Sequence, residues 1–448
     1  MSQAHTARDW ITANLADLIA LHDVPGAQVA VLVDGEVVDV AAGVVNKATG
    51  VPATDKAVFQ IGSITKVWTA TLVQQLVNEG LLDLDRPVRE YLPEFAADDD
   101  EGASAAITTR QLLSHTCGLE GDRFTDTGTN DDAIERYVGT LADAVQLFPP
   151  GERFSYCNSG FVLLGRIVEV LRREPYNAAL RRHLIAPLGL SHVSTHAGEA
   201  VLQLAAIGHI GPDVRPAPVY GLPASAAPAG ATLAMSARSL LGFVRMHLTD
   251  PAFDAMREPQ VPVPGLAALG DHWGLGWMLW ECPGGSVIGH DGGTIGQYAF
   301  LRIVPAAGVA VVVLTNGGNA PALFRAVGGH LLRELAGVQL PEPPRVPSEP
   351  APIDARRAAG SYRDALVDLD LAVHDDGSAS LTTTPRTAES RLLFGDGRTA
   401  RLVRLDEDRL IAVEERAGRH EVYALAGADS EGRALYLHSG RAALRTGA

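Results

Sequence analysis

The sequence predicts a mixed α/β domain followed by a small all-β domain. At 448 residues the chain is long enough for two or three domains. Residues 1–340 mix amphipathic helical patterns with β-branched runs, which indicates the α/β unit. Residues 341–352 are rich in proline and predict a semi-rigid linker. In residues 353–448 short alternating runs recur between turns such as Asp376-Gly377, which indicates a small antiparallel barrel or sandwich.

Local patterns place the individual elements. Two β-branched runs meet at Asp34-Gly35, the strongest short-range signal of a hairpin. Residues 211–230 hold five prolines and three glycines and predict a long irregular loop, either a functional lid or a mobile segment. The polar stretch 120–132 predicts a surface loop able to edge a cleft. Helices are expected at 7–22, 63–79, 107–119, within 149–171, at 235–246 and at 319–336. The hairpin is expected over 28–42, and further strands at 273–280, 286–290, 297–304, 309–315, 366–374, 378–384, 400–405, 409–415, 421–425 and 434–438.

Composition and charge exclude several classes of function. The net charge of −16 argues against binding to nucleic acid or to an anionic membrane surface. The three cysteines, Cys117, Cys157 and Cys282, form no metal-ligand pair and fit a reduced compartment. The N-terminus lacks the pattern of a secretory signal, and no apolar stretch reaches the roughly 20 residues that span a bilayer. We therefore expect a cytoplasmic protein that binds neither nucleic acid nor membrane.

A serine followed three residues later by a lysine is the first chemical signal. Ser63 opens the predicted helix 63–79, and residues three apart share a helix face, so the Lys66 amine can approach the Ser63 hydroxyl. The Ser63 amide, at the helix start, can donate to an oxyanion. Burial and the helix dipole should lower the pKa of Lys66 toward a value useful to a base. Only three of the 37 basic residues are lysines. This bias favours a role for Lys66 that arginine cannot fill, because arginine does not give up its proton in a protein.

Two further polar clusters complete the candidate site. Tyr156 supplies a phenol, whose pKa a neighbouring cationic amine would lower, and Asn158 supplies an amide that can hold the lysine or the substrate. His290 precedes Gly292 and Gly293, which have no side chains, so a substrate can lie alongside their backbone. A strand edge there could pair with an acyl amide, and the Gly293 N–H is the candidate second oxyanion donor.

These motifs resemble those of the serine β-lactamases and penicillin-binding proteins, in particular the branch of class C β-lactamases, D-peptidases and β-lactamase-fold esterases and transacylases. That signature is Ser-x-x-Lys, then Ser/Tyr-x-Asn, then Lys-Thr-Gly or a variant. Residues 63–66, 156–158 and 290–292 match it in order and spacing. Further similar segments lie at 60–66, 111–118, 150–156 and 186–190, and the resemblance covers roughly residues 10–337.

The resemblance implies an antiparallel sheet flanked by helices with an inserted helical lobe, and the trailing barrel is similar to C-terminal domains of some members. Ser63 would be the acylated nucleophile and Lys66 its proton partner. Tyr156 would pass the proton to the leaving group and activate the second nucleophile. The residues implied to orient or bind the substrate are Asn158, His290 and Gly292, and the backbone N–H groups implied for the oxyanion hole are those of Ser63 and Gly293.

His290 departs from the family pattern, because β-lactamases and cell-wall peptidases carry lysine there. The fixed charge of that lysine helps to hold a substrate carboxylate, which a neutral imidazole does not do at pH 7. Esters, amides or peptides without that anion are therefore the expected substrates.

Other residues near the motifs have structural interpretations. His115 is interpreted as a hydrogen-bonded structural histidine, and Cys157 as a small packing residue that faces away from the nucleophile. Asp291 either tunes His290 or faces solvent. The tryptophans, of which any one could instead line a pocket, are interpreted as core: Trp273, Trp277 and Trp280.

We expect a serine acyl-enzyme hydrolase that cleaves an ester or amide bond of a small-molecule or peptide-like substrate without a metal or organic cofactor. The first alternative is a transacylase that passes the acyl group to an amine or alcohol. A β-lactamase or DD-peptidase proper, or a non-catalytic binding module with the same fold, is less expected. A homo-oligomer is compatible with the sequence, and the last domain could cap the cleft, mediate dimerisation or add stability.

Overall fold

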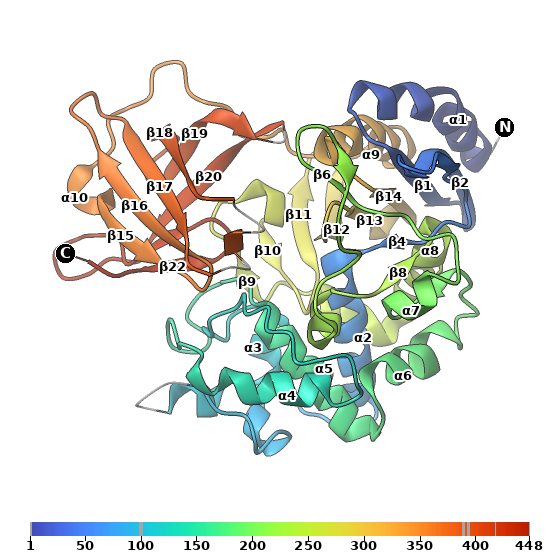
Figure 1. Cartoon of the computed structure of the whole chain (residues 1–448), viewed down its shortest axis with the longest axis horizontal. Coiled ribbons are helices and arrows are strands. Elements are labelled where there is room, and N and C mark those ends of the chain that lie inside the picture. Colours follow the sequence, from blue (N-terminus) through green and yellow to red (C-terminus); the bar gives the residue numbers. More distant parts are fainter. Residues whose placement is uncertain (1, 98–101, 388–389, 392–394, 417, 448) are drawn as a thin grey trace.

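The computed structural model describes residues 2–97, 102–387, 390–391, 395–416 and 418–447. Figure 1 shows a larger part that mixes helices and strands beside an eight-stranded barrel at the C-terminal end of the chain. The predicted fold class, an α/β part followed by a small all-β barrel, is confirmed. The domain limits at residues 340 and 352 remain our proposal.

The larger part is built on a nine-stranded antiparallel sheet in the order β3-β2-β1-β14-β13-β12-β11-β10-β9. β1 and β2 form the predicted hairpin, in which Asp34 and Gly35 make the turn with φ of 53° and 74°. The strands of the sheet are β1 (Gly26–Val33), β2 (Glu36–Asn46), β3 (Val51–Pro52), β9 (Val261–Pro262), β10 (His272–Trp273), β11 (Met278–Cys282), β12 (Gly285–Gly293), β13 (Tyr298–Val304) and β14 (Val309–Thr315).

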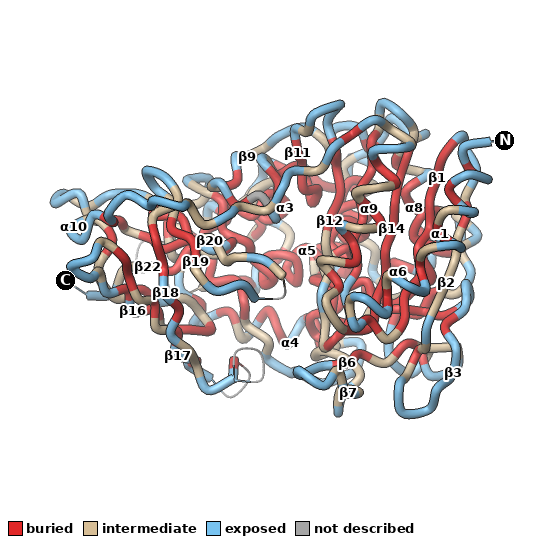
Figure 2. Tube along the Cα trace, turned by 90° about the horizontal axis from the view of Figure 1, so that it is seen from above, coloured by how far each residue is buried: buried red, intermediate tan, exposed pale blue. Residues whose placement is uncertain are grey.

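Both faces of this sheet are covered. Along β1, Val29 and Val31 pack in one core cluster, whereas Ala30 and Leu32 pack in another on the opposite face. A strand covered on both faces has a continuous apolar sequence, because consecutive side chains point to opposite sides. Figure 2 shows the central strands as buried tubes. The covering helices are α1 (Gln3–Leu21) and α9 (Ala320–Ala336) on the first face, and α2 (Thr65–Asn78) and α8 (Ala237–Thr249) on the second.

A helical lobe lies beyond α2 (Figure 1). Its longest helix, α5, begins at Asn158 because Cys157 caps it, with the Cys157 Sγ accepting from the Gly160 N–H at 3.2 Å. The cap places the start of α5 directly after Tyr156. The helices of this region are α3 (Thr109–Leu113), α4 (Ala133–Gly139), α5 (Asn158–Arg172), α6 (Tyr176–Leu180) and α7 (Ala197–Ala200).

The predicted irregular loop 211–230 is ordered and mostly buried in its second half. The 3₁₀ segment Ala224–Ala229 contacts α2 and α5. Gly230 has a φ of 122°, and a Cβ there would lie 2.4 Å from the Gly62 carbonyl oxygen. Small side chains therefore let this segment approach the nucleophile turn. The short strands in this region are β4 (Phe59–Gln60), β8 (Ala234–Met235) and β5 (Val193–Ser194) in one sheet, and β6 (His209–Ile210) and β7 (Arg215–Pro216) in another.

The C-terminal barrel contains eight antiparallel strands around its own apolar core. Six of its strands were predicted, whereas β15 and β22 were not, because four residues carry too little alternation to identify a strand. These two strands pair with each other, Tyr362 opposite Arg445, and close the barrel. The barrel elements are α10 (Ala355–Ala358), β15 (Gly360–Arg363), β16 (Val367–Val373), β17 (Ala379–Pro385), β18 (Arg398–Arg404), β19 (Arg409–Arg416), β20 (Arg419–Ala426), β21 (Tyr436–His438) and β22 (Ala442–Arg445).

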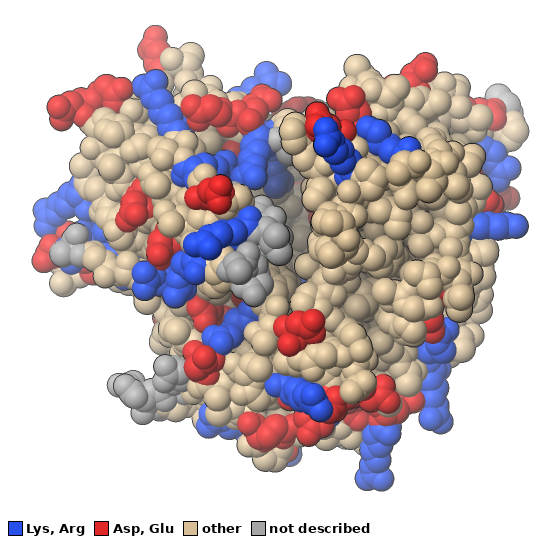
Figure 3. Space-filling model, viewed as in Figure 1, with Lys and Arg blue, Asp and Glu red and all other residues tan. Residues whose placement is uncertain are grey.

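Acidic and basic side chains are interspersed on the face of the molecule shown in Figure 3, most densely over the barrel. On that face neither sign of charge forms a continuous field. Among the described residues, no helix has the length and apolar character needed to cross a lipid bilayer.

Candidate active site

Ser63 lies in a 3₁₀ turn, Gly62–Ile64, that leads directly into α2. The prediction of a helix opened by this serine is confirmed, and α2 ends at Asn78, one residue before the predicted end. Gly62 has a φ of 50°, a conformation that glycine adopts without strain. A Cβ on Gly62 would lie 2.5 Å from the Gly293 nitrogen, so the backbones of these two segments are in contact.

Lys66 reaches Ser63 from the first turn of α2. Its Nζ lies 3.1 Å from the Ser63 Oγ and donates to the Ala229 carbonyl oxygen at 2.5 Å. The residue is 0% exposed. Burial lowers the pKa of Lys66 well below its ordinary value, and the positive charge of Arg441 lowers it further, while Asp122 opposes the shift. The predicted direction of the shift is confirmed, and the amine is suited to act as a base.

Tyr156 stands beside both residues. The Lys66 Nζ lies 4.8 Å from the centre of the Tyr156 ring, and the phenol lies next to the Ser63 hydroxyl. Burial raises the pKa of Tyr156 above its ordinary value, although the Ser63 hydroxyl and Arg441 act in the other direction. The predicted lowering by a cationic amine is wrong, because the same burial that desolvates the phenol disfavours the charged form of Lys66. At neutral pH the phenol therefore carries a proton to donate.

The third motif lies at the end of β12. β11 pairs with β12 only as far as Gly289, so His290–Gly293 pair with β13 alone in this sheet, and β12 also contacts the Ser63 turn. A Cβ on Gly292 would lie 1.9 Å from the Ile61 carbonyl oxygen and 3.0 Å from the Ser63 nitrogen. Glycine is therefore required at 292. The contact between Gly293 and the Ser63 turn fits the expected pair of oxyanion donors.

His290 is fully buried and neutral. Its Nδ1 donates to the Asp291 carbonyl oxygen at 2.6 Å, which leaves Nε2 as the unprotonated nitrogen. Burial lowers the pKa of His290 to about 3, with a further contribution from Lys66. The Asp291 carboxylate instead accepts from Arg302 at 2.5 and 3.1 Å. The backbone of Asp291, and not its side chain, therefore fixes the tautomer of His290.

Two residues that the sequence did not reveal lie next to Tyr156. Asn158 donates to the Asp122 Oδ1 at 2.5 Å, and the Asp122 carboxylate also pairs with Arg441. Asp122 belongs to the predicted surface loop 120–132, yet it is only 6% exposed. Arg441 lies in the turn between β21 and β22, and its guanidinium carbon is 4.8 Å from the centre of the Tyr156 ring. The barrel thus contributes a side chain to the candidate site.

Arg441 changes an expectation based on His290. The loss of the motif lysine removes one fixed positive charge, as predicted, but a guanidinium enters from the barrel. The charge argument against substrates with a carboxylate is therefore incomplete, because it considered only the charges of the three motifs and not that of Arg441.

The structural interpretations of the neighbouring residues are confirmed. His115 is fully buried, and its Nδ1 accepts from the Cys157 N–H at 3.0 Å. The His115 ring lies 4.3 Å from the ring of Tyr156 and supports it from behind. The Cys157 Sγ faces Gly160 and the Cys117 thiol inside the lobe. The three tryptophans of the third-motif region are core residues: Trp273, Trp277 and Trp280. Trp273 also packs on Tyr156.

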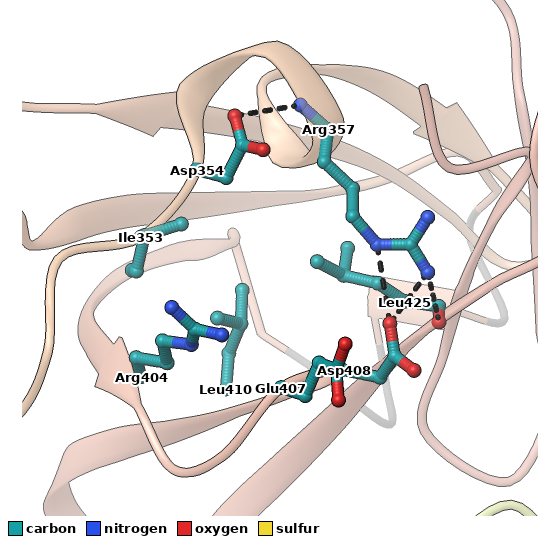
Figure 4. Close-up of a pocket in the computed structure, with 8 residues that line it drawn as sticks. All are labelled: Ile353, Asp354, Arg357, Arg404, Glu407, Asp408, Leu410 and Leu425. Atoms are coloured by element: carbon teal, nitrogen blue, oxygen red, sulfur yellow. Dashed lines mark hydrogen bonds and ion pairs between the residues drawn. The ribbon is translucent and has the colours of Figure 1, made fainter. Parts of the chain in front are cut away.

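A cavity of about 410 Å³ lies in the barrel and shares no lining residue with the Ser63 site. Figure 4 shows the ion pair of Arg357 with Asp408 at its wall. Its lining residues are Ile353, Asp354, Arg357, Arg404, Glu407, Asp408, Leu410 and Leu425.

Known proteins share both the sequence and the architecture. The Beta-lactamase family model matches residues 11–333. Penicillin-binding protein 4 of Amycolatopsis lactamdurans is 44% identical over 358 residues, which cover 76% of this chain and 93% of that protein. The crystal structure of SurE with D-Leu superposes with a TM-score of 0.78 at 29% identity and covers 99% of this chain and 100% of SurE, the barrel included. The octameric penicillin-binding protein homologue from Pyrococcus abyssi shares the fold, with a TM-score of 0.63 at 22% identity over 94% of this chain and 96% of that chain.

The family match covers most of the α/β part, and the three motifs it contains meet around one hydroxyl. The chain belongs to the beta-lactamase family of serine hydrolases and acyl-transferring enzymes.

Proposed function

We propose that this protein forms an acyl-enzyme on Ser63 and hydrolyses an ester or amide bond of a small-molecule or peptide-like substrate. The observation that carries the proposal is the pair of contacts to one hydroxyl. The Lys66 Nζ lies 3.1 Å from the Ser63 Oγ, and the Tyr156 phenol lies next to the same hydroxyl. A hydroxyl held between a buried amine of lowered pKa and a phenol is an activated nucleophile with a proton donor beside it.

In acylation, Lys66 takes the proton of Ser63 as the Oγ bonds to the carbonyl carbon of the substrate. The carbonyl oxygen becomes an oxyanion that accepts hydrogen bonds from the N–H groups of Ser63 and Gly293. Tyr156 protonates the leaving group and recovers a proton from the Lys66 ammonium. The leaving group departs, and an ester on Ser63 remains.

The remaining motif residues shape the site. Asn158, at the start of α5, orients the polar groups around Tyr156. The His290–Gly293 segment offers the strand edge that pairs with the acyl part of the substrate, and Gly292 keeps this edge close to Ser63. The His290 Nε2 is an acceptor for a hydrogen of the substrate, because Nδ1 carries the proton.

Deacylation requires a second nucleophile that loses a proton to Tyr156 and Lys66. With water the products are the free acid and the regenerated Ser63. With an amine or alcohol the acyl group passes to that acceptor and Ser63 is regenerated, which is the transacylase alternative.

Two of the similar proteins guide the choice of substrates. The similar SurE structure is one with D-Leu, and the Amycolatopsis relative is a penicillin-binding protein. We therefore include acyl donors with a D-amino acid residue, with and without a free carboxylate.

The test measures the turnover of nitrophenyl esters, D-leucine amides and esters, and a β-lactam, each with and without an amine acceptor. The proposal predicts ester or amide turnover by the wild type and loss of turnover in Ser63→Ala. The ratio of transferred product to free acid separates transfer from hydrolysis. Equal turnover by Ser63→Ala and the wild type would refute an acyl-enzyme on Ser63.

A further inference from the structure

We infer that Arg441 of the C-terminal barrel is a positioning residue for acylation, because it fixes Asp122 and Asn158 while its own turn fixes the backbone of Tyr156. The inference rests on the proposed function, since it assigns Arg441 a part in acylation of Ser63. It also gives the barrel a role in catalysis instead of a role limited to stability or dimerisation.

The turn that carries Arg441 is bonded to the segment that carries Tyr156. The Gly440 carbonyl oxygen accepts from the Tyr156 N–H at 2.9 Å. The Ala442 N–H donates to the Ser155 Oγ at 3.1 Å. The backbone position of Tyr156 therefore depends on a hydrogen bond to the barrel.

His438 adds two hydrogen bonds to this contact between the barrel turn and the segment that carries Tyr156. Its Nδ1 accepts from the Gly440 N–H at 3.1 Å, and its Nε2 donates to the Phe154 carbonyl oxygen at 2.9 Å. The bond from Gly440 requires the neutral imidazole, because Nδ1 must be free to accept, and burial lowers the pKa of His438 to about 4. The ring thus fastens the turn to residue 154, two residues before Tyr156.

The side chain of Arg441 reaches further into the site. It donates to both carboxylate oxygens of Asp122, with Nη2 3.3 Å from Oδ1. A buried carboxylate requires a cation or several donors, and Asp122 also accepts from the Asn158 amide at 2.5 Å. Arg441 therefore determines where the carboxylate lies, and the carboxylate determines where the Asn158 amide points.

The loop that carries Asp122 is itself pressed against the start of α5. The Ser159 N–H donates to the Gly121 carbonyl oxygen at 2.8 Å. A Cβ on Gly121 would lie 2.8 Å from the Cys157 Cα. A change in the Arg441–Asp122 pair therefore acts on the segment that carries Tyr156 and Asn158, because the Gly121 backbone is in contact with the Cys157 backbone and bonded to Ser159.

The same pair acts on Lys66 through its charges. The cation of Arg441 lowers the pKa of Lys66, and the anion of Asp122 raises it. Loss of Arg441 should therefore move the acid limb of the acylation rate to higher pH, and loss of the Asp122 charge should move it to lower pH. The titratable and charged groups that face Lys66 are Tyr156, Arg441, Asp122, Cys157, His115 and His290.

The experiment measures the rate at which nitrophenyl acetate acylates Ser63 from pH 5 to pH 10. This ester is neutral, so a role of Arg441 limited to binding a substrate anion would leave its rate unchanged. We expect Arg441→Met to acylate about 10- to 100-fold more slowly, as for a small misplacement of catalytic groups, with its acid limb at higher pH. In the double variant with Asp122→Asn, the limb should return toward the wild type while the rate stays low.

Two barrel variants serve as controls. Arg409→Met removes a bond from the barrel to the Gly265 carbonyl oxygen at 2.7 Å, away from Tyr156, and should keep the wild-type rate and pH profile. Arg441→Lys retains the charge and should keep the acid limb in place, although it loses part of the rate with the second hydrogen bond.

The outcomes separate this inference from the proposed function. If the wild type forms no adduct on Ser63, the proposed function fails. If the wild type is acylated, and Arg441→Met is acylated at the same rate with the same acid limb, the positioning role is refuted. If Arg441→Met fails to fold because Asp122 is left unpaired, the double variant decides: a wild-type rate refutes the role, and a reduced rate supports it.

Discussion

The buried Lys66 makes the stability of the protein depend on pH in a way that one substitution isolates. The proposed mechanism requires Lys66 to be neutral in the folded protein at pH 7, and burial shifts its pKa in that direction. In the unfolded chain the amine keeps its ordinary pKa of about 10.4. Between those two pKa values the unfolded state binds one proton more than the folded state. The free energy of unfolding therefore rises with pH in this range.

The size of the effect follows from the linkage of one proton. Each pH unit within the range should add about 1.4 kcal/mol to the free energy of unfolding, or about 2.7 kcal/mol from pH 7 to pH 9. Lys66→Met removes this dependence. The substitution also leaves the Ala229 carbonyl oxygen without its donor, at a cost of about 1–3 kcal/mol, but that cost does not vary with pH.

The assay is urea unfolding of the wild type and Lys66→Met at pH 7, 8 and 9. The difference in free energy of unfolding, wild type minus variant, should increase by about 1.4 kcal/mol per pH unit. Lys56→Met, which replaces an exposed lysine, is the matched control and should show a constant difference. A constant difference for Lys66→Met as well would mean that the folded protein keeps Lys66 protonated, and the base in our mechanism would be wrong.

Three further predictions concern the groups around Ser63. Tyr156→Phe keeps the ring that packs against His115 and removes the phenolic proton, so ester turnover should fall about 10²- to 10⁴-fold with little change in thermal stability; turnover near the wild-type level would remove Tyr156 from the proton path. Gly292→Ala should distort the nucleophile turn and lower both activity and melting temperature, whereas Gly329→Ala, where a Cβ on α9 has open space, should leave activity unchanged and should not lower the melting temperature; equal losses in the two variants would contradict the close approach of β12. The wild type should lose stability as the pH falls from about 6.5 toward 4, because buried histidines must take up protons on unfolding. His438→Gln should reduce that loss, as measured by unfolding at pH 7 and pH 5, and an unchanged loss would show that His438 is protonated in the fold.

Local geometry explains why much of the site was predictable. Ser63 and Lys66 are three residues apart, and the 3₁₀ turn that continues into α2 brings their side chains together. The hairpin at Asp34-Gly35 and the strands of the central sheet follow from patterns of a few residues. The motif around His290 was found in the same way, as a strand that ends in glycines.

The missed residues depend on contacts between distant segments. Arg441 and Asp122 meet only because the barrel docks against the helical lobe, and neither carries a local motif. Ala229 binds Lys66 through its carbonyl oxygen, so its side chain gave no signal. The pKa of Tyr156 was predicted with the wrong sign, because the balance between burial and neighbouring charge depends on three-dimensional packing. An unusually buried loop residue such as Asp122 becomes recognisable only once the fold is known.

The central claim is that Lys66 deprotonates Ser63 so that the hydroxyl forms an acyl-enzyme. The most direct measurement is intact mass and peptide mapping after exposure to a fluorophosphonate, for the wild type, Ser63→Ala and Lys66→Arg. We predict a single adduct on the peptide that contains Ser63 in the wild type, none in Ser63→Ala, and formation slowed about 10²- to 10⁴-fold in Lys66→Arg, because arginine keeps its proton. An adduct on another residue, or an equal rate in Lys66→Arg, would contradict the claim.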